Sequence, residues 1–291
     1  MRLIQVATLS KGESLQDGAF FGDMLFRFDS YGCGKVYDST ALGNSDESVT
    51  LPLIGSISLI SGDGKAPHSN SVVFGAQYYD ASDEFPLLYS NVYNNYSNQE
   101  DIHEGECYVY RILREGSDFS ATLVQIIKIG FVKDGDLWYS SEDYQDIRPY
   151  GNFVLDTEKH LYHAFTMRDK TKTMRFFTFP EPRVKEGVLD EKSGVRTLTL
   201  GKEDILDTFD TEYFNFIQGA TCKDGLIYST EGFHADIHPA IRVIDPKEKK
   251  TILALDLYEN GFPYEAELIS YHNNLCYYGD AEGNLFRVDF D

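Results

Sequence analysis

The sequence predicts an all-β protein folded as a single five-bladed β-propeller, and three observations lead to this prediction. A hairpin template recurs along the chain, with a polar residue ten positions before an aromatic residue of the second strand. Each hairpin is followed by further strand-like segments, which gives units of three or four antiparallel strands. Helical periodicity is nearly absent, and only residues 200–210 could form a turn or two of helix. Repeats of about 50 residues with four strands each are typical of propellers.

The recurring hairpins have the turn residues that tight β-turns require. Examples are Gly22-Asp23, Lys223-Asp224-Gly225 and Asn273-Asn274, which are residue types that favour hairpin turns. A further copy begins at His68, and its turn is lengthened before Leu87 resumes the second strand. The polar positions and their aromatic partners are Gln16 and Phe26, Asn152 and Tyr162, Gln218 and Tyr228, and Glu267 and Tyr277.

Further strands are expected after each hairpin because apolar and β-branched residues dominate these segments. The third strands are expected at residues 107–113, 173–179, 240–245 and 284–290, and the fourth at residues 121–129, 195–200 and 251–257.

The length of the chain sets the number of blades. Five units in 291 residues allow about 58 residues each, so five blades are expected. Six is the alternative, because the 82 residues between Asn70 and Asn152 could contain another blade. The last unit has room for only three strands, and the N-terminal segment RLIQVATL is expected to add the fourth and close the ring. Residues 1–291 then form one domain, with a Tyr/Asn-rich insertion at about 90–106.

The composition narrows the range of partners. A formal net charge of −21 and a pI of about 4.6 argue against nucleic acid and anionic membranes as partners. The four cysteines have no metal-binding spacing and are expected to be free thiols. These thiols and the lack of a recognisable signal peptide favour a cytoplasmic location, with export of a chain whose signal has been trimmed as the alternative.

The repeated polar position suggests where a ligand would bind. The first strand of each propeller blade lines the axis, so residues at the same place in every blade should form a ring. Such a ring could satisfy buried backbone groups and water, or it could bind a ligand at a concave mouth. The predicted ring consists of Gln16, Asn70 (or His68), Asn152, Gln218 and Glu267.

Part of the chain resembles a known family of propellers. About 70 residues that include Phe216-Ile217-Gln218-Gly219, Tyr228-Ser229-Thr230-Glu231-Gly232, Ile241-Arg242-Val243-Ile244-Asp245 and Glu265-Ala266-Glu267-Leu268 resemble the opening blades of bacterial and plant glutaminyl cyclases. The resemblance implies a five-bladed propeller that cyclises N-terminal glutamine without a metal, with Glu267 at the position of the catalytic glutamate. Glu267 would then move a proton from the attacking amine to the leaving ammonia, while Gln218, Asn152 and Asn70 would hold the carboxamide.

This chain departs from the family pattern in two respects. The matching blades lie at its C-terminal end, which requires a circular shift. The tryptophan expected after the glutamate blade is missing, since the only tryptophan is Trp138. The fold therefore carries over more readily than the activity.

Two other groups of residues are candidates for binding. Trp138, Tyr150 and Arg148 lie near the start of the third blade, where aromatic rings beside polar groups would suit sugar recognition or would pack between blades. His234, Asp236 and His238 alternate as metal ligands would on one face of a strand, although a loop before Pro239 explains them better. No cofactor is expected.

Together these features predict a recognition propeller that binds a small molecule, a glycan or a peptide at the mouth of its axis. A glutaminyl-cyclase-like aminoacyltransferase that uses Glu267 is the first alternative. A metal-dependent lyase or hydrolase is the second.

Overall fold

The computed structural model describes residues 1–9, 15–60, 66–92, 106–129, 147–168, 173–212, 217–233 and 235–290. These residues form 22 β-strands and one short 3-10 helix, η1 (Lys202–Asp204). No helix among them is long and apolar enough to cross a membrane.

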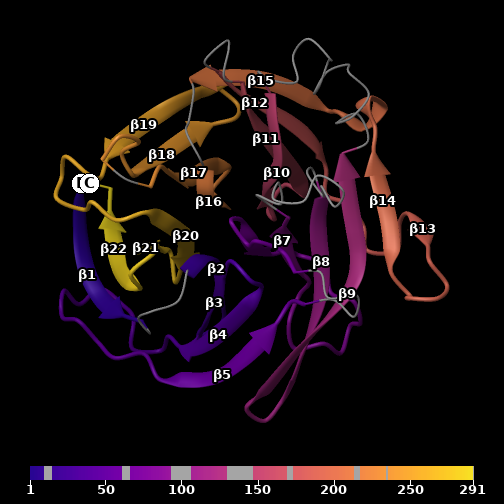
Figure 1. Cartoon of the computed structure of the whole chain (residues 1–291), viewed down its shortest axis with the longest axis horizontal. Helices are drawn as coiled ribbons and strands as arrows, with labels where there is room; N and C mark the ends of the chain where they lie inside the picture. The colour runs from indigo at the N-terminus through magenta and orange to yellow at the C-terminus, as the bar shows by residue number, and fades with distance from the viewer. Residues whose placement is uncertain are drawn as a thin grey trace.

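Five sheets are arranged around a common axis (Figure 1), so the chain is a five-bladed β-propeller, as predicted, and the six-blade alternative is wrong. Within each of the regular blades, neighbouring strands are antiparallel and follow one another in sequence, because short turns connect them. From the axis outwards, blade one consists of β2 (Leu15–Phe21), β3 (Met24–Asp29), β4 (Cys33–Asp38) and β5 (Leu53–Ser58), and blade four of β16 (Ile217–Lys223), β17 (Leu226–Glu231), β18 (Ala240–Asp245) and β19 (Lys250–Asp256).

Blade five closes the ring with the N-terminal strand. Strand β1 (Arg2–Thr8) pairs antiparallel with β22 (Asn284–Asp289), so that Arg2 lies opposite Asp289 at the two ends of the chain. The order from the axis is β20 (Ala266–His272), β21 (Leu275–Asp280), β22 and β1, which confirms the predicted closure.

Blades two and three show where the strand prediction fails. Residues 195–200 were expected to be a fourth strand of blade three, but β14 (Arg196–Leu200) pairs parallel with β9 (Asp118–Ile129) of blade two. The fourth strand of blade three is instead β15 (Asp207–Glu212). Blade two consists of β6 (Val72–Phe74), β7 (Leu88–Asn91), β8 (Glu106–Glu115) and β9, and β14 and β13 (Val188–Leu189) extend its outer edge. Blade three consists of β10 (Ile147–Asp156), β11 (Leu161–Arg168), β12 (Thr173–Pro180) and β15.

The reason for this exchange lies in the side chains. Strand β15 has the sequence DTFDTE, in which Phe209 is the only large apolar residue, so its pattern does not resemble a buried strand. Strand β14 has two leucines, and Leu200 is buried in the cluster that also contains Ile127 of β9. The apolar segment therefore stabilises the outer edge of blade two, and the polar segment completes blade three.

The hydrophobic core consists of five clusters, one between each pair of adjacent blades. Between blades one and two, for example, Phe26 packs edge-on against Phe74 with ring centroids 5.1 Å apart. Between blades five and one, Val6 and Ala7 of β1 pack in the same cluster as Leu25 and Tyr277. Because each blade is stabilised by both of its neighbours, the apolar core is continuous around the ring.

Candidate functional site

Three inner strands have a β-bulge at the repeated polar position, and in a fourth, β10, the register shifts just before it. In β16, Gln218 is the extra residue between Ile217 and Gly219, which face consecutive residues of β17. A bulge leaves one residue out of the ladder and redirects its side chain, so a polar residue fits into an otherwise buried strand. The other three register shifts contain Gln16 and Asp17 in β2, Glu267 in β20, and the residues between Arg148 and Asn152 in β10.

The redirected side chain of Gln218 in blade four bonds to polar side chains of blades two and five. The amide nitrogen of Asn70 donates to Oε1 of Gln218 over 2.6 Å. The amide nitrogen of Gln218 donates to Oε1 of Glu265 over 2.5 Å. The two ends of the Gln218 amide are therefore used for different neighbours, which fixes its orientation.

The same kind of contact joins the remaining blades. Gln16 of blade one donates to Oε1 of Glu267 in blade five over 3.3 Å. Asn91 of blade two donates to Oδ1 of Asn152 in blade three over 2.5 Å, and Asn152 donates to the carbonyl oxygen of Ile217 in blade four over 3.2 Å. All five predicted ring residues thus lie near the axis, and none is more than 6% exposed.

Asp17 joins blades one and two at the same level. Its backbone N–H donates to the carbonyl oxygen of Ser69, and its carboxylate accepts the N–H of Val72 over 2.9 Å. The side chain is fully buried, and burial raises the pKa of Asp17 despite the N–H groups of Val72, Gly18 and Ala220 that favour the ionised form.

Buried ionisable groups lie in and next to this ring. Burial raises the pKa of Glu267 well above its ordinary value, and the nearby charge of Glu265 raises it further. The guanidinium of Arg27 in β3 is 2% exposed and donates to the carbonyl oxygen of Asp280 over 3.1 Å. Burial lowers the pKa of Arg27, whereas the charges of Glu267, Asp17 and Asp280 raise it. Carboxylates therefore outnumber cationic groups at the axis.

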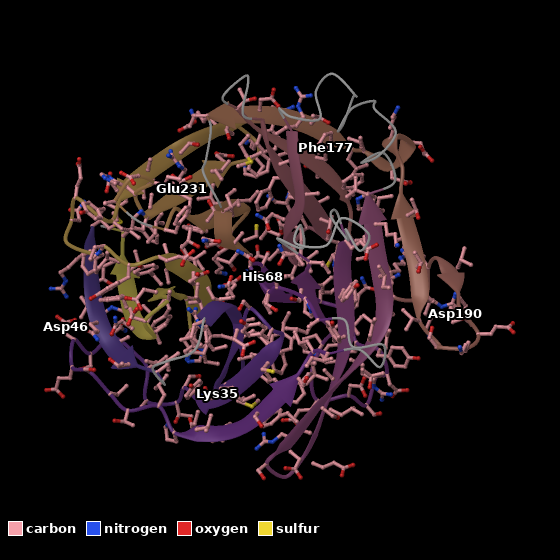
Figure 2. The ribbon with its side chains drawn as sticks, viewed as in Figure 1. Lys35, Asp46, His68, Phe177, Asp190 and Glu231 are labelled. Carbon is pink, nitrogen blue, oxygen red and sulfur yellow. The ribbon has the colours of Figure 1, made fainter. Side chains whose placement is uncertain are left out.

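Glu265 and His68 are titratable groups close to the axis that are only partly buried. Each precedes an inner strand, β20 or β6, so both lie at the same end of the propeller. Figure 2 shows His68 near the centre of the ring. Burial raises the pKa of Glu265 and lowers that of His68 to about 4, so His68 is neutral at physiological pH. We call Glu265, His68 and the buried Gln16, Asn70 and Gln218 the axial mouth.

The remaining predicted binding residues are not tested by the described part of the chain. Trp138 lies outside the described residues, and of Arg148 and Tyr150 only the backbone in β10 is described. Their proposed role in sugar recognition stays a prediction.

The predicted metal candidates do not share a strand. Asp236 is exposed in the connection between β17 and β18, which also contains His238, and His234 lies outside the described residues. Ligand atoms of His238, Asp256 and Glu259 do lie within 4.8 Å of one another. His238 Nδ1 lies 2.6 Å from Asp256 Oδ2, and this hydrogen bond raises the pKa of His238, so an ordinary ion pair accounts for the arrangement.

Sequence reasoning missed several axial residues. Glu265, Asp17 and Arg27 are central to the charge distribution, yet none of the three stands at the repeated polar position that predicted the ring. Two features of the sequence could have predicted the two acidic residues. Glu265 lies two positions before Glu267, and Asp17 directly follows Gln16. Arg27 follows Phe26 within an apolar strand, where a charge needs partners.

Comparison with known proteins shows similarity of fold only. No protein-family model matches the sequence, and no curated protein matches it significantly. A solved glutaminyl cyclase from Myxococcus xanthus is 11% identical, with a TM-score of 0.49, and the match covers 99% of this chain and 94% of that one. A luciferin-regenerating enzyme is 9% identical, with a TM-score of 0.47 and coverage of 98% and 94%. The five blades follow from this chain's own hydrogen-bonded sheets, and likenesses at this level do not identify a ligand or a reaction.

Proposed function

We propose that this propeller is a noncatalytic recognition module that binds the amino-terminal end of a peptide at the axial mouth. The observation that carries the proposal is the carboxylate of Glu265. It is partly exposed, it lies beside the axis, and the amide of Gln218 holds it in place. A carboxylate fixed in this way suits an ammonium group, which has three donors.

The local charge supports a cationic ligand. Asp17, Glu267 and Asp280 interact electrostatically with the buried guanidinium of Arg27, and Glu265 interacts with Glu267. Burial raises the pKa of all four carboxyl groups. A bound ammonium group would favour the ionised form of Glu265 and so lower its pKa. His68 is neutral at physiological pH and so would not repel the ammonium group.

An array of peptides tests the proposal, with each sequence present once with a free amino terminus and once acetylated. We expect binding to a subset of free peptides and loss of that binding on acetylation, because acetylation removes the charge and two of the donors. Equal binding to the free and acetylated forms would rule out recognition of the terminal amine.

A glycan is the second candidate ligand, and Tyr264 favours it. This side chain is 50% exposed and directly precedes Glu265. A sugar could therefore stack on the tyrosine ring while Glu265 accepts a hydrogen bond from a sugar hydroxyl. A glycan array distinguishes the two ligand classes, since the peptide proposal predicts no binding to neutral sugars.

Catalysis by Glu267 is the enzymatic alternative. A raised carboxyl pKa is typical of a general acid or base, and this favours a role in proton transfer. Against it, the side chain of Glu267 is fully buried, whereas that of the nearby Glu265 is partly exposed and is therefore the more accessible to a substrate. Incubation with a glutamine-initiated peptide should release no ammonia if recognition without chemistry is the function.

A further inference from the structure

Five polar side chains near the axis are more than nine-tenths buried and have atoms without a hydrogen-bond partner. They come from blades one, two and five, and they include donors as well as acceptors. The atoms are Oε1 of Gln16, Oδ1 of Asp17, Oδ1 of Asn70, Oε2 of Glu267, and both Nε and Nη1 of Arg27.

These side chains lie around one small region. Nε2 of Gln16 lies 3.3 Å from Oε1 of Glu267. A Cβ built on Gly219 would lie 2.4 Å from the carbonyl oxygen of Glu267 and 3.2 Å from Cγ of Asp17, so these two acidic residues pack against the same glycine. Asn70 lies next to this region, because its side chain donates a hydrogen bond to Gln218, which directly precedes Gly219.

Arg27 interacts electrostatically with Glu267 and Asp17, but it forms no ion pair within 4.0 Å with any described carboxylate. Buried donors and acceptors without a partner destabilise the folded state, and the cost is larger when the group is charged. A gap that separates such groups beyond direct contact is the usual place for a bridging molecule.

We propose that the axis contains an internal hydration site, in which ordered water bridges the guanidinium of Arg27 to Glu267 and Asp17. Water is favoured over a metal ion because it accepts from the N–H groups of Arg27 and donates to the facing oxygens. A cation would complement the oxygens alone, and the guanidinium charge would repel it. The groups that this water would bridge, Arg27, Glu267 and Asp17, are not part of the axial mouth, and the proposal does not depend on the proposed ligand.

Magnetic relaxation dispersion of deuterated solvent detects long-lived internal water in solution, and it tests the proposal on the full chain. We expect the dispersion amplitude to fall in Arg27→Met, which removes the donors. It should stay unchanged in Arg175→Met, a matched loss of one guanidinium from the ion pair with Asp210 in blade three. An unchanged amplitude in a folded Arg27→Met would overturn the proposal.

A high-resolution crystal structure of the wild-type protein provides a second readout, which does not depend on whether the variant folds. The proposal predicts water density within hydrogen-bonding distance of Arg27 and of at least one of the two carboxylates. Density for a metal ion, or a rise in the unfolding temperature on addition of calcium, would contradict it.

Discussion

Gln218 is the axial residue whose surroundings explain its identity most fully. It occupies a bulge, it is 6% exposed, and its amide bonds Asn70 on one side and Glu265 on the other. A leucine would suit the burial of the site but would leave a donor of Asn70 and the carboxylate of Glu265 without these partners. A buried amide with both ends engaged therefore stabilises the contacts between blades two, four and five.

Gln218→Leu should destabilise the protein by roughly 2–4 kcal/mol, because two hydrogen bonds are lost while Asn70 stays buried and Glu265 stays partly buried. Urea unfolding measures this free energy. Gln5→Leu is the matched control, since Gln5 also donates two side-chain hydrogen bonds but in an exposed position. Equal losses in the two variants would show that burial of the axial amide does not matter.

Glu267 should make stability depend on pH. Its pKa is raised in the folded state, so the folded protein binds the proton more tightly than the unfolded chain does. Stability therefore falls as the pH rises from the ordinary glutamate value through the raised pKa. Glu267→Gln should raise the unfolding temperature at pH 7 and change it little near pH 4. The exposed control Glu47→Gln should show no such difference, and the same result for both variants would contradict the assignment.

At the residue scale, the sequence predicted which positions meet at the axis but not what surrounds them. A fixed offset of ten residues identified Gln16, Asn152, Gln218 and Glu267, because equivalent positions of repeated blades must meet at the axis. Glu265 and Arg27 do not stand at a position that recurs in the other blades, because their roles depend on which blades are neighbours. The full burial of Glu267 was equally hidden, because exposure at the axis depends on all five blades together.

The bulge is the element that adapts a buried strand to a polar residue. After Gln218, the chain continues with Gly219, where a side chain would meet the backbone of blade five. Bulge and glycine together let the inner strands of blades four and five approach closely. This pairing is visible in the sequence as Gln-Gly at 218–219.

Gly219→Ala should be strongly destabilising, because the added Cβ would lie 2.4 Å from the carbonyl oxygen of Glu267, which belongs to the backbone. Overpacking of this kind costs about 1–3 kcal/mol. Gly43→Ala is the control, since a Cβ there would have no atom within 4 Å. Thermal unfolding of both variants measures the effect, and a neutral Gly219→Ala would mean that blades four and five can separate without loss.

Prediction of the strands succeeded where apolar residues alternate and failed where they do not. Strand β22 and most of β8 were predicted because Tyr, Phe, Val and Leu dominate them. Strand β15 was missed, because only Phe209 and Thr211 of its six residues are buried. The parallel pairing of β14 with β9 joins residues that are about 70 positions apart, and no local pattern specifies such a partner.

At the scale of the whole molecule, ring closure depends on the first eight residues. Strand β1 covers the edge of β22 and contributes Val6 and Ala7 to the core between blades five and one. Arg287 strengthens the same junction, because it bonds Asp46 of blade one over 2.8 Å as well as Asp289. The five blades are therefore mutually dependent.

Removal of residues 1–8 should lower the unfolding temperature by roughly 10 °C or more, since buried side chains are lost and a strand edge is opened. A circular permutant that links residue 291 to residue 1 and opens the chain within the exposed turn at Gly116 should keep nearly all of its stability. Scanning calorimetry compares the two proteins. A truncated chain as stable as the permutant would mean that closure contributes little.

Recognition of a ligand amine by Glu265 at the axial mouth can be measured by isothermal titration calorimetry with one free-amine peptide identified on the array. We predict that Glu265→Gln weakens binding at least about tenfold, equivalent to 1.4 kcal/mol. Glu259→Gln, which changes an exposed carboxylate in the same connection, should bind like the wild type. Unchanged affinity in a folded Glu265→Gln would contradict the account.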